Sequence, residues 1–179
     1  MAKEIGDIIF FKNNSLLSRT IRLVETGKFR QDVPSHVAVI DFLPYGDVSL
    51  IEAQGLKVRR ARLSKYRKQK LWYARLKEPR DIQEGIHWLN QQIGKRYDFK
   101  QLVGIWLRGF WRLLGSKAYK KIRKIRNFLD SKQQFICSEL IEGYAEKTGE
   151  RLWHGDISLV TPYDLWRSSE VIIYEEAMI

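Results

Sequence analysis

Residues 35–54 limit the folds open to this chain more than any other segment, because two apolar runs of strand length flank a turn. The runs are SHVAVIDFL, which follows a proline, and VSLIEAQ. The residues between them, PYGD at 44–47, are typical of turns. Runs of this length that are rich in β-branched and aromatic residues are typical of strands. The segment therefore predicts a β-hairpin.

The turn also predicts the pairing of the two strands. If residues 44–46 form a three-residue loop ending in glycine, a common hairpin connection, Ala38 faces Glu52 and His36 faces Gln54. Glu52 is then diagonal to His36 on the same face of the sheet, at about 7–8 Å between backbones, which side chains can span. A loop of two or four residues would place Glu52 on the opposite face.

The remaining periodicity predicts an α+β architecture, with an antiparallel sheet from the first half and helices packed around it. Apolar runs predict further strands at 8–12, 71–77 and 171–175. Helical spacing predicts helices at 16–27, 82–93, 102–114, 119–129 and 135–149, and a short one at 161–165. We expect a single domain, 1–179, with a basic, aromatic helical insertion at about 100–130.

The positive charge is concentrated in two segments. The net charge is +11, yet residues 57–70 and 99–129 contain no acid and many of the Lys and Arg residues. This segregation indicates an anionic partner. Trp, Phe and Tyr interleave with the cations between 102 and 126, which suits an anionic membrane, a lipid-like substrate or an anionic wall polymer. The alternative is a buried apolar helix followed by a solvated basic one. Nucleic acid is less favoured, because no recognised binding motif is present.

Composition excludes several other classes. A single cysteine allows no intrachain disulfide and no Cys/His zinc pattern, and we expect neither a metal nor a cofactor. Charges at Lys3, Glu4 and Asp7 interrupt the start of the chain, so no secretory signal is expected. No apolar run reaches the length of about 20 residues that a spanning helix needs. We expect a cytoplasmic or virion-associated protein, or one acting at the cell wall.

Cys137 stands at the start of the helix predicted at 135–149. A helix N-terminus lowers a thiol pKa and favours the nucleophilic thiolate. The N–H groups there can also hold an oxyanion that forms during attack on a carbonyl. The competing interpretation is a buried core cysteine, since free cysteine is among the most buried residues.

His36 is the best candidate base among three histidines, although a lone strand histidine is usually structural. Glu52 in the predicted register could orient its imidazole and stabilise the charged form. Gln54, directly opposite, competes for that role, and Glu52 by itself reads as a solvated strand carboxylate. His87 reads as a partly exposed helix residue. His154, in a loop, is the competing base.

Several motifs together resemble a known family. They are GDIIFF at 6–11, SHVAVI at 35–40, LIEA at 50–53, YDF at 97–99 and FICSELI at 135–141. In this order they resemble the circularly permuted branch of the NlpC-type papain-like superfamily, in particular the YiiX/YebB-like proteins, and more distantly the lecithin retinol acyltransferase group. The resemblance implies a permuted papain-like fold, an antiparallel half-barrel sheet packed against a cysteine-bearing helix. The basic segment 100–127 is longer than a minimal member needs.

The resemblance also implies roles for individual residues. Cys137 is expected to be the nucleophile, His36 the base and Glu52 the polar third member. Tyr97, from the YDF motif, is expected to lie near the cleft and contact substrate. Apart from the resemblance, Gln54 is expected to contact substrate because it lies opposite His36 in the predicted hairpin.

The implied chemistry is thiol-dependent hydrolysis, with peptidoglycan stem-peptide amide bonds as the expected substrate. One alternative is a lipid-directed thioesterase or acyltransferase, favoured by the apolar and basic insertion. Another is a non-catalytic binding or structural module on the same fold, for example in a phage particle.

Overall fold

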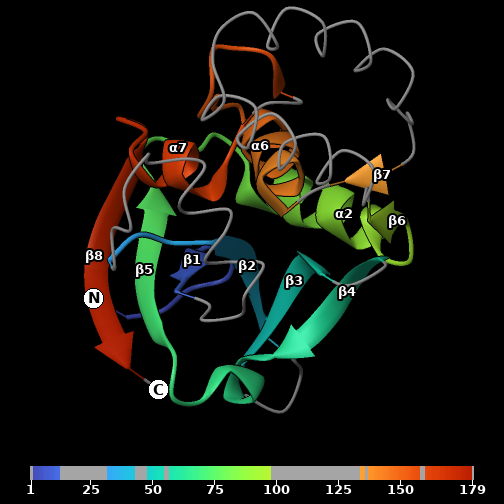
Figure 1. The fold of residues 1–179 in the computed structure, drawn as a ribbon. Helices are drawn as coiled ribbons and strands as arrows, with labels where there is room; N and C mark the ends of the chain where they lie inside the picture. Colours follow the sequence, from blue (N-terminus) through green and yellow to red (C-terminus); the bar gives the residue numbers. More distant parts are fainter. Residues whose placement is uncertain are drawn as a thin grey trace, which may run out of the picture.

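The computed structural model describes residues 2–12, 32–42, 48–54, 57–97, 134–135, 137–157 and 160–178 (Figure 1). The strands are β1 (Ile8–Phe11), β2 (His36–Phe42), β3 (Val48–Gln54), β4 (Lys57–Arg62), β5 (Lys70–Leu76), β6 (Arg96–Tyr97), β7 (Gln134–Phe135) and β8 (Val171–Met178). The helices are α2 (Ile82–Gln92), α6 (Cys137–Lys147), α7 (Pro162–Trp166) and the 3₁₀ turn η1 (Leu63–Tyr66).

The described strands form one sheet in the order β7-β6-β4-β3-β2-β1-β5-β8. Its six longer strands, from β4 to β8, pair antiparallel throughout, and only the short β6–β7 pair is parallel. Figure 1 shows α2, α6 and α7 grouped on one side of this sheet. The predicted α+β class and antiparallel sheet are confirmed.

The predicted hairpin register is confirmed. Val39 pairs with Ile51 and Phe42 with Val48, the pairing expected for a three-residue loop. From Val39 back to His36, β2 pairs along its other edge with β1, so that His36 lies opposite Phe11. His36 therefore begins β2 at the end of the sheet opposite the hairpin turn.

Two apolar clusters cover the two faces of the sheet. Ile8 and Phe10 of β1 belong to the cluster that packs against the helices, whereas Ile9 and Phe11 belong to the cluster on the other face. Successive side chains of a strand point to opposite faces, so a central strand must be apolar at every position to satisfy both clusters. This explains why the IIFF run of β1 is continuous rather than alternating.

Helix α6 places its first residue by packing on both the sheet and α2. Leu140, Ile141 and Tyr144 are fully buried against the sheet. On the side toward α2, Gly143 lies so close to the ring of Trp88 that a methyl group there would overlap it. The Tyr144 hydroxyl donates a 2.9 Å hydrogen bond to the carbonyl of Gly6. These contacts fix the position of Cys137 at the helix start.

The other helix predictions within the described residues are also confirmed. Asp81 caps α2 by accepting a hydrogen bond from the backbone N–H of Glu84, as a capping carboxylate should. Thr161 and Asp164 form a reciprocal capping box at the start of α7. The helices predicted at 16–27, 102–114 and 119–129 lie outside the described residues, as does nearly all of the insertion expected at about 100–130.

Strand β4 was not predicted. Its sequence, KVRRAR, has only two apolar residues in six, and sequence analysis treated it as part of a cationic segment. It pairs along its whole length with β3, from Ser49↔Arg62 to Gln54↔Lys57. Tertiary pairing therefore overrides a weak local pattern, because the partner strand supplies the hydrogen bonds.

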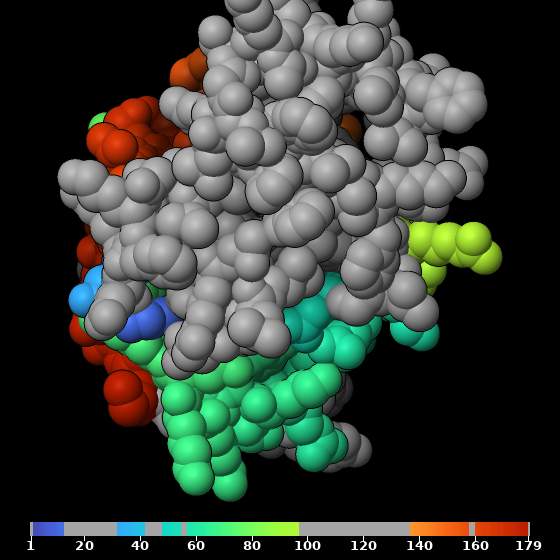
Figure 2. Space-filling view, viewed as in Figure 1, coloured from blue at the N-terminus to red at the C-terminus, as the bar shows by residue number. Residues whose placement is uncertain are grey.

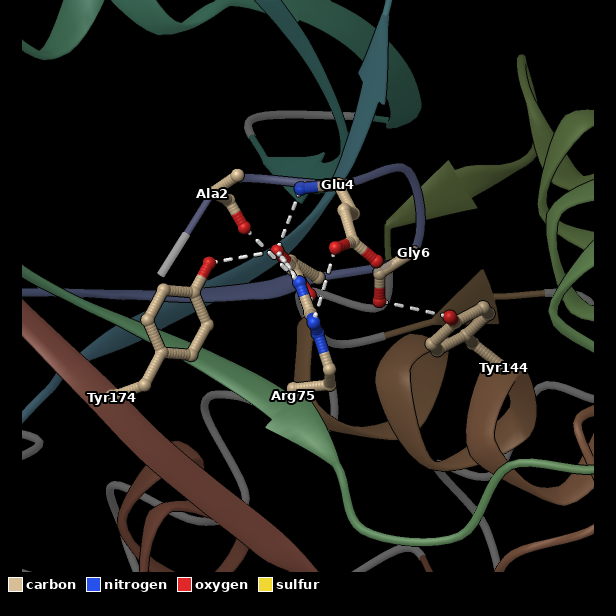
Figure 3. A network of polar contacts seen from close by, with 7 residues as sticks. Ala2, Glu4, Gly6, Arg75, Tyr144 and Tyr174 are labelled. Atoms are coloured by element: carbon tan, nitrogen blue, oxygen red, sulfur yellow. Dashed lines mark hydrogen bonds and ion pairs between the residues drawn. The ribbon is translucent and has the colours of Figure 1, made fainter.

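A polar network joins the N-terminal segment to β5 and β8 (Figure 3). Asp7, which is 1% exposed, accepts hydrogen bonds from Arg75 at 2.6 Å and 2.9 Å and from the Tyr174 hydroxyl at 2.7 Å. The backbone N–H of Glu4 donates to the same carboxylate at 2.8 Å. A buried carboxylate needs such donors, and together they tie three distant segments of the chain to one point.

No helix among the described residues has both the length and the apolar character needed to cross a membrane.

Candidate active site

The site begins with a buried pair between His36 and Glu52. The imidazole Nε2 lies 2.7 Å from Glu52 Oε2, which is hydrogen-bonding distance. Glu52 is 0% exposed and His36 is 6% exposed. Glu52 is therefore not a solvated strand carboxylate, and the diagonal contact expected from the hairpin register is present.

Cys137 is a second partner of the His36 imidazole. It is the first residue of α6, and its side chain is within hydrogen-bonding reach of His36. The imidazole therefore interacts with both the thiol and the carboxylate. This row of three residues, Cys137, His36 and Glu52, joins segments that are far apart in the sequence.

Two further residues complete the surroundings of Glu52. Arg59 Nε on β4 donates to Glu52 Oε1 at 3.0 Å, and the Tyr66 hydroxyl in η1 donates to Glu52 Oε2. The ring of Phe11 packs between Tyr66, at 4.5 Å between centroids, and His36, at 5.7 Å. Phe11 thereby shields the polar row from one side, which strengthens the charge interactions within it.

These contacts shift two pKa values in opposite directions. Burial disfavours the charged imidazole, but hydrogen bonding and charge interaction with Cys137 and Glu52 outweigh it and raise the pKa of His36 from 6.5 to about 10. Burial alone would also raise the pKa of Glu52, yet His36, Tyr66 and Arg59 together lower it from 4.5 to about 2. An imidazolium facing a carboxylate is therefore the favoured state at neutral pH.

Sequence reasoning did not find Arg59 and Tyr66. Both stand in the cationic segment 57–70, where neither apolar alternation nor a motif distinguishes them. In the structure β4 pairs with β3, and Arg59 lies directly opposite Glu52. Finding Arg59 from the sequence would have required this pairing, which the sequence of β4 does not predict.

Gln54 joins the same cluster, but through its neighbours on the sheet. Its side-chain oxygen accepts hydrogen bonds from Arg59 and lies 3.1 Å from the Tyr66 hydroxyl. It does not take the place of Glu52 beside the imidazole. Tyr97 lies in β6, and its side chain is outside the described part of the structure. The expected contacts of Gln54 and Tyr97 with substrate stay predictions.

The other two histidines lie elsewhere. His87, on the exposed side of α2, contacts Gln91 at 2.8 Å between side-chain nitrogens. His154 is exposed in the loop after α6. Of the three histidines, His36 is the one that contacts both the thiol and a buried carboxylate.

Comparison with known proteins identifies the fold. No family model matches the chain, and no curated protein matches it. A solved structure does: the crystal structure of the metalloprotein YiiX from Escherichia coli O157:H7, with a TM-score of 0.66 and 16% sequence identity over 100% of both chains. The chain therefore has the YiiX-like, permuted papain-like fold that the motifs implied.

The residues at this site do not fit a metal centre. Both oxygens of Glu52 already accept hydrogen bonds, and His36 Nε2 is engaged by the same carboxylate. Elsewhere in the part of the chain that the structure describes, no group of three or more His, Cys, Asp or Glu residues is arranged to hold an ion.

Proposed function

We propose that this protein is a thiol-dependent hydrolase in which Cys137 is the nucleophile, His36 the general base and acid, and Glu52 the residue that orients the imidazole. Two interactions of His36 support the proposal: its 2.7 Å contact with the buried Glu52 carboxylate and its interaction with the Cys137 side chain. A nucleophile beside a base that is itself oriented by a third group is the arrangement that nucleophilic catalysis requires.

The proposed reaction has two stages. The Cys137 thiolate attacks the substrate carbonyl carbon, and the resulting oxyanion accepts hydrogen bonds from the first N–H groups of α6, which have no acceptor within the helix. The His36 imidazolium then donates its proton to the leaving amine as the carbonyl–nitrogen bond breaks, which leaves an acyl-enzyme. Water, deprotonated by the now neutral His36, attacks the acyl carbon, and the carbon–sulfur bond breaks to release the carboxylic acid and regenerate the Cys137 thiolate beside the His36 imidazolium.

The proposed substrate is an amide bond in a peptidoglycan stem peptide. This choice follows from the resemblance of the motifs around His36 and Cys137 to NlpC-type enzymes. The test is the release of new amino groups from purified peptidoglycan by the wild-type protein and by the Cys137→Ala variant. Release by the wild type alone supports the proposal. Cleavage of lipid thioesters or esters instead would favour the lipid-directed alternative, and activity toward neither would favour a binding module.

We further propose that the turn around η1 faces an anionic surface such as a membrane or a wall polymer. Arg59, Arg60 and Lys70 of the cationic segment pair with carboxylates within the fold, which removes them from such a role. Lys65, Arg67 and Lys68 are exposed, and the segment that carries them projects from the lower end of the molecule (Figure 2). Salt-sensitive binding to anionic vesicles or wall polymers, reduced when these three cations become glutamine, would support it.

A further inference from the structure

Three elements bring donors to the Glu52 carboxylate. His36 comes from β2, Arg59 from β4 and Tyr66 from η1, and each contacts one of the two oxygens. Only His36 belongs to the proposed catalytic row. The other two donors have no direct contact with the thiol that the structure describes, so any effect they have on the reaction must pass through Glu52.

The hydroxyl of Tyr66 has one proton and two acceptors within reach, Glu52 and Gln54. The charged carboxylate is the stronger acceptor, and Gln54 is already served by the guanidinium of Arg59. The proton therefore belongs to the Glu52 bond. Burial and the Glu52 charge raise the pKa of Tyr66, so the hydroxyl stays protonated and continues to donate.

The geometry points to Arg59 and Tyr66 as positioning residues that keep the Glu52 carboxylate ionised and aimed at His36. This inference rests on the proposed function, because it concerns the same catalytic row. Loss of one donor makes a carboxylate bind its own proton more readily. A protonated Glu52 cannot hold the imidazolium, and without the imidazolium the thiolate of Cys137 loses its counter-ion.

Several charged and titratable groups contact this cluster and take part in that balance. Cys137 of α6 faces His36, and Arg59 and Tyr66 face Glu52 together with the neutral Gln54. Arg60, the next residue on β4, bonds instead to Asp41 at 2.7 Å and to Asn90 at 2.7 Å. It therefore offers a matched control, an arginine paired with a strand carboxylate outside the row.

The experiment measures the rate at which iodoacetamide alkylates Cys137 as a function of pH. The chain has one cysteine, so the signal comes from this thiol alone, and no substrate needs to be known. An ion pair of thiolate and imidazolium keeps the rate high at acidic pH, whereas an ordinary thiol reacts slowly there. The variants are Tyr66→Phe, Arg59→Gln and Arg59→Lys, with Arg60→Gln as the control.

We expect Tyr66→Phe and Arg59→Gln each to move the acid limb of the profile upward by about one pH unit, which is roughly a tenfold lower rate on that limb. Arg59→Lys, which keeps the charge but loses the fork of donors, should move it less. Arg60→Gln should leave the profile where it is. Tyr66→Phe removes a single hydroxyl from a packed ring, so it tests the inference even if Arg59→Gln fails to fold.

The outcomes separate the two proposals. If Glu52→Gln shifts the profile but Tyr66→Phe and Arg59→Gln do not, the catalytic row stands and the positioning role is wrong. An equal shift in Arg60→Gln would also overturn the positioning role, because the effect would then be general to β4. If Glu52→Gln and His36→Gln leave the profile unchanged, the proposed function itself fails.

Discussion

Two buried carboxylates, Asp7 and Glu52, have nearly the same chemical setting, and only Glu52 lies in the candidate active site. Asp7 and Glu52 each accept hydrogen bonds from an arginine and from a tyrosine hydroxyl. Around Asp7 the remaining donor is the backbone N–H of Glu4, whereas around Glu52 it is the imidazole of His36. A backbone amide cannot change its charge, but an imidazole can.

The comparison shows what separates a structural network from a reactive one. The Asp7 network joins the N-terminal segment to β5 and β8 and has no nucleophile among its described members. The Glu52 network ends at Cys137 through His36. A buried carboxylate with an arginine and a tyrosine is thus not by itself a sign of catalysis. The histidine and the thiol beyond it are what make the difference.

Replacing the nucleophile should have the largest effect on this contrast. Cys137→Ala should lower turnover by roughly a millionfold, the loss seen when a triad nucleophile is removed. Amino-group release from peptidoglycan measures it, with circular dichroism to show that the fold persists. Turnover close to that of the wild type would contradict the proposed mechanism.

Changing the carboxylate of the candidate site should have the next largest effect. Glu52→Gln keeps the shape of the side chain but removes its charge, so His36 is no longer held in the orientation and charge state that the reaction needs. We expect kcat to fall by about a hundredfold to ten-thousandfold. Steady-state kinetics on the same substrate checks this, and an unchanged kcat would remove Glu52 from the mechanism.

The matched change in the other network should act on stability instead. Asp7→Asn leaves the partly exposed Arg75 without its buried carboxylate partner, and we expect a loss of about 1–3 kcal/mol in the free energy of unfolding. Urea unfolding measures the loss. The alkylation profile of Cys137 in the folded variant should match the wild type, and a shifted profile would show that the two networks are coupled.

The smallest expected effect is the change with pH in the free energy of unfolding that the charged His36–Glu52 pair contributes. The raised pKa of His36 contributes stability that is complete below pH 6.5 and is lost as the pH rises toward about 10. The lowered pKa of Glu52 contributes stability that is complete above pH 4.5 and is lost as the pH falls toward about 2. Both contributions are present in full between pH 4.5 and pH 6.5.

The measurement is the difference in unfolding free energy between the wild type and a variant with both His36→Gln and Glu52→Gln, followed across pH. We expect this difference to be largest within that window and to decrease on either side. A difference that does not change with pH would mean that the pair is not charged in the folded protein.

Much of the candidate site could be predicted because it depends on local patterns. The hairpin at 35–54 has a turn whose length determines the register, and the register alone puts Glu52 diagonal to His36. The apolar period around Cys137 predicts a helix at 135–149, and the structure forms it over Cys137–Lys147, with Phe135 in β7 instead. Patterns that repeat within a few residues can be read from the sequence, since neighbours along the chain are neighbours in the element.

The sequence by itself thus determined the main strands, the helix that starts at the cysteine and the pairing of the hairpin. Only the tertiary structure decided that β4 joins the sheet, that Arg59 and Tyr66 both reach Glu52, and that Cys137 meets His36 across most of the chain. The reason is physical: β4 has little apolar pattern of its own, and its place depends on hydrogen bonds that β3 supplies. Contacts between distant segments depend on how whole elements pack, which no local pattern encodes.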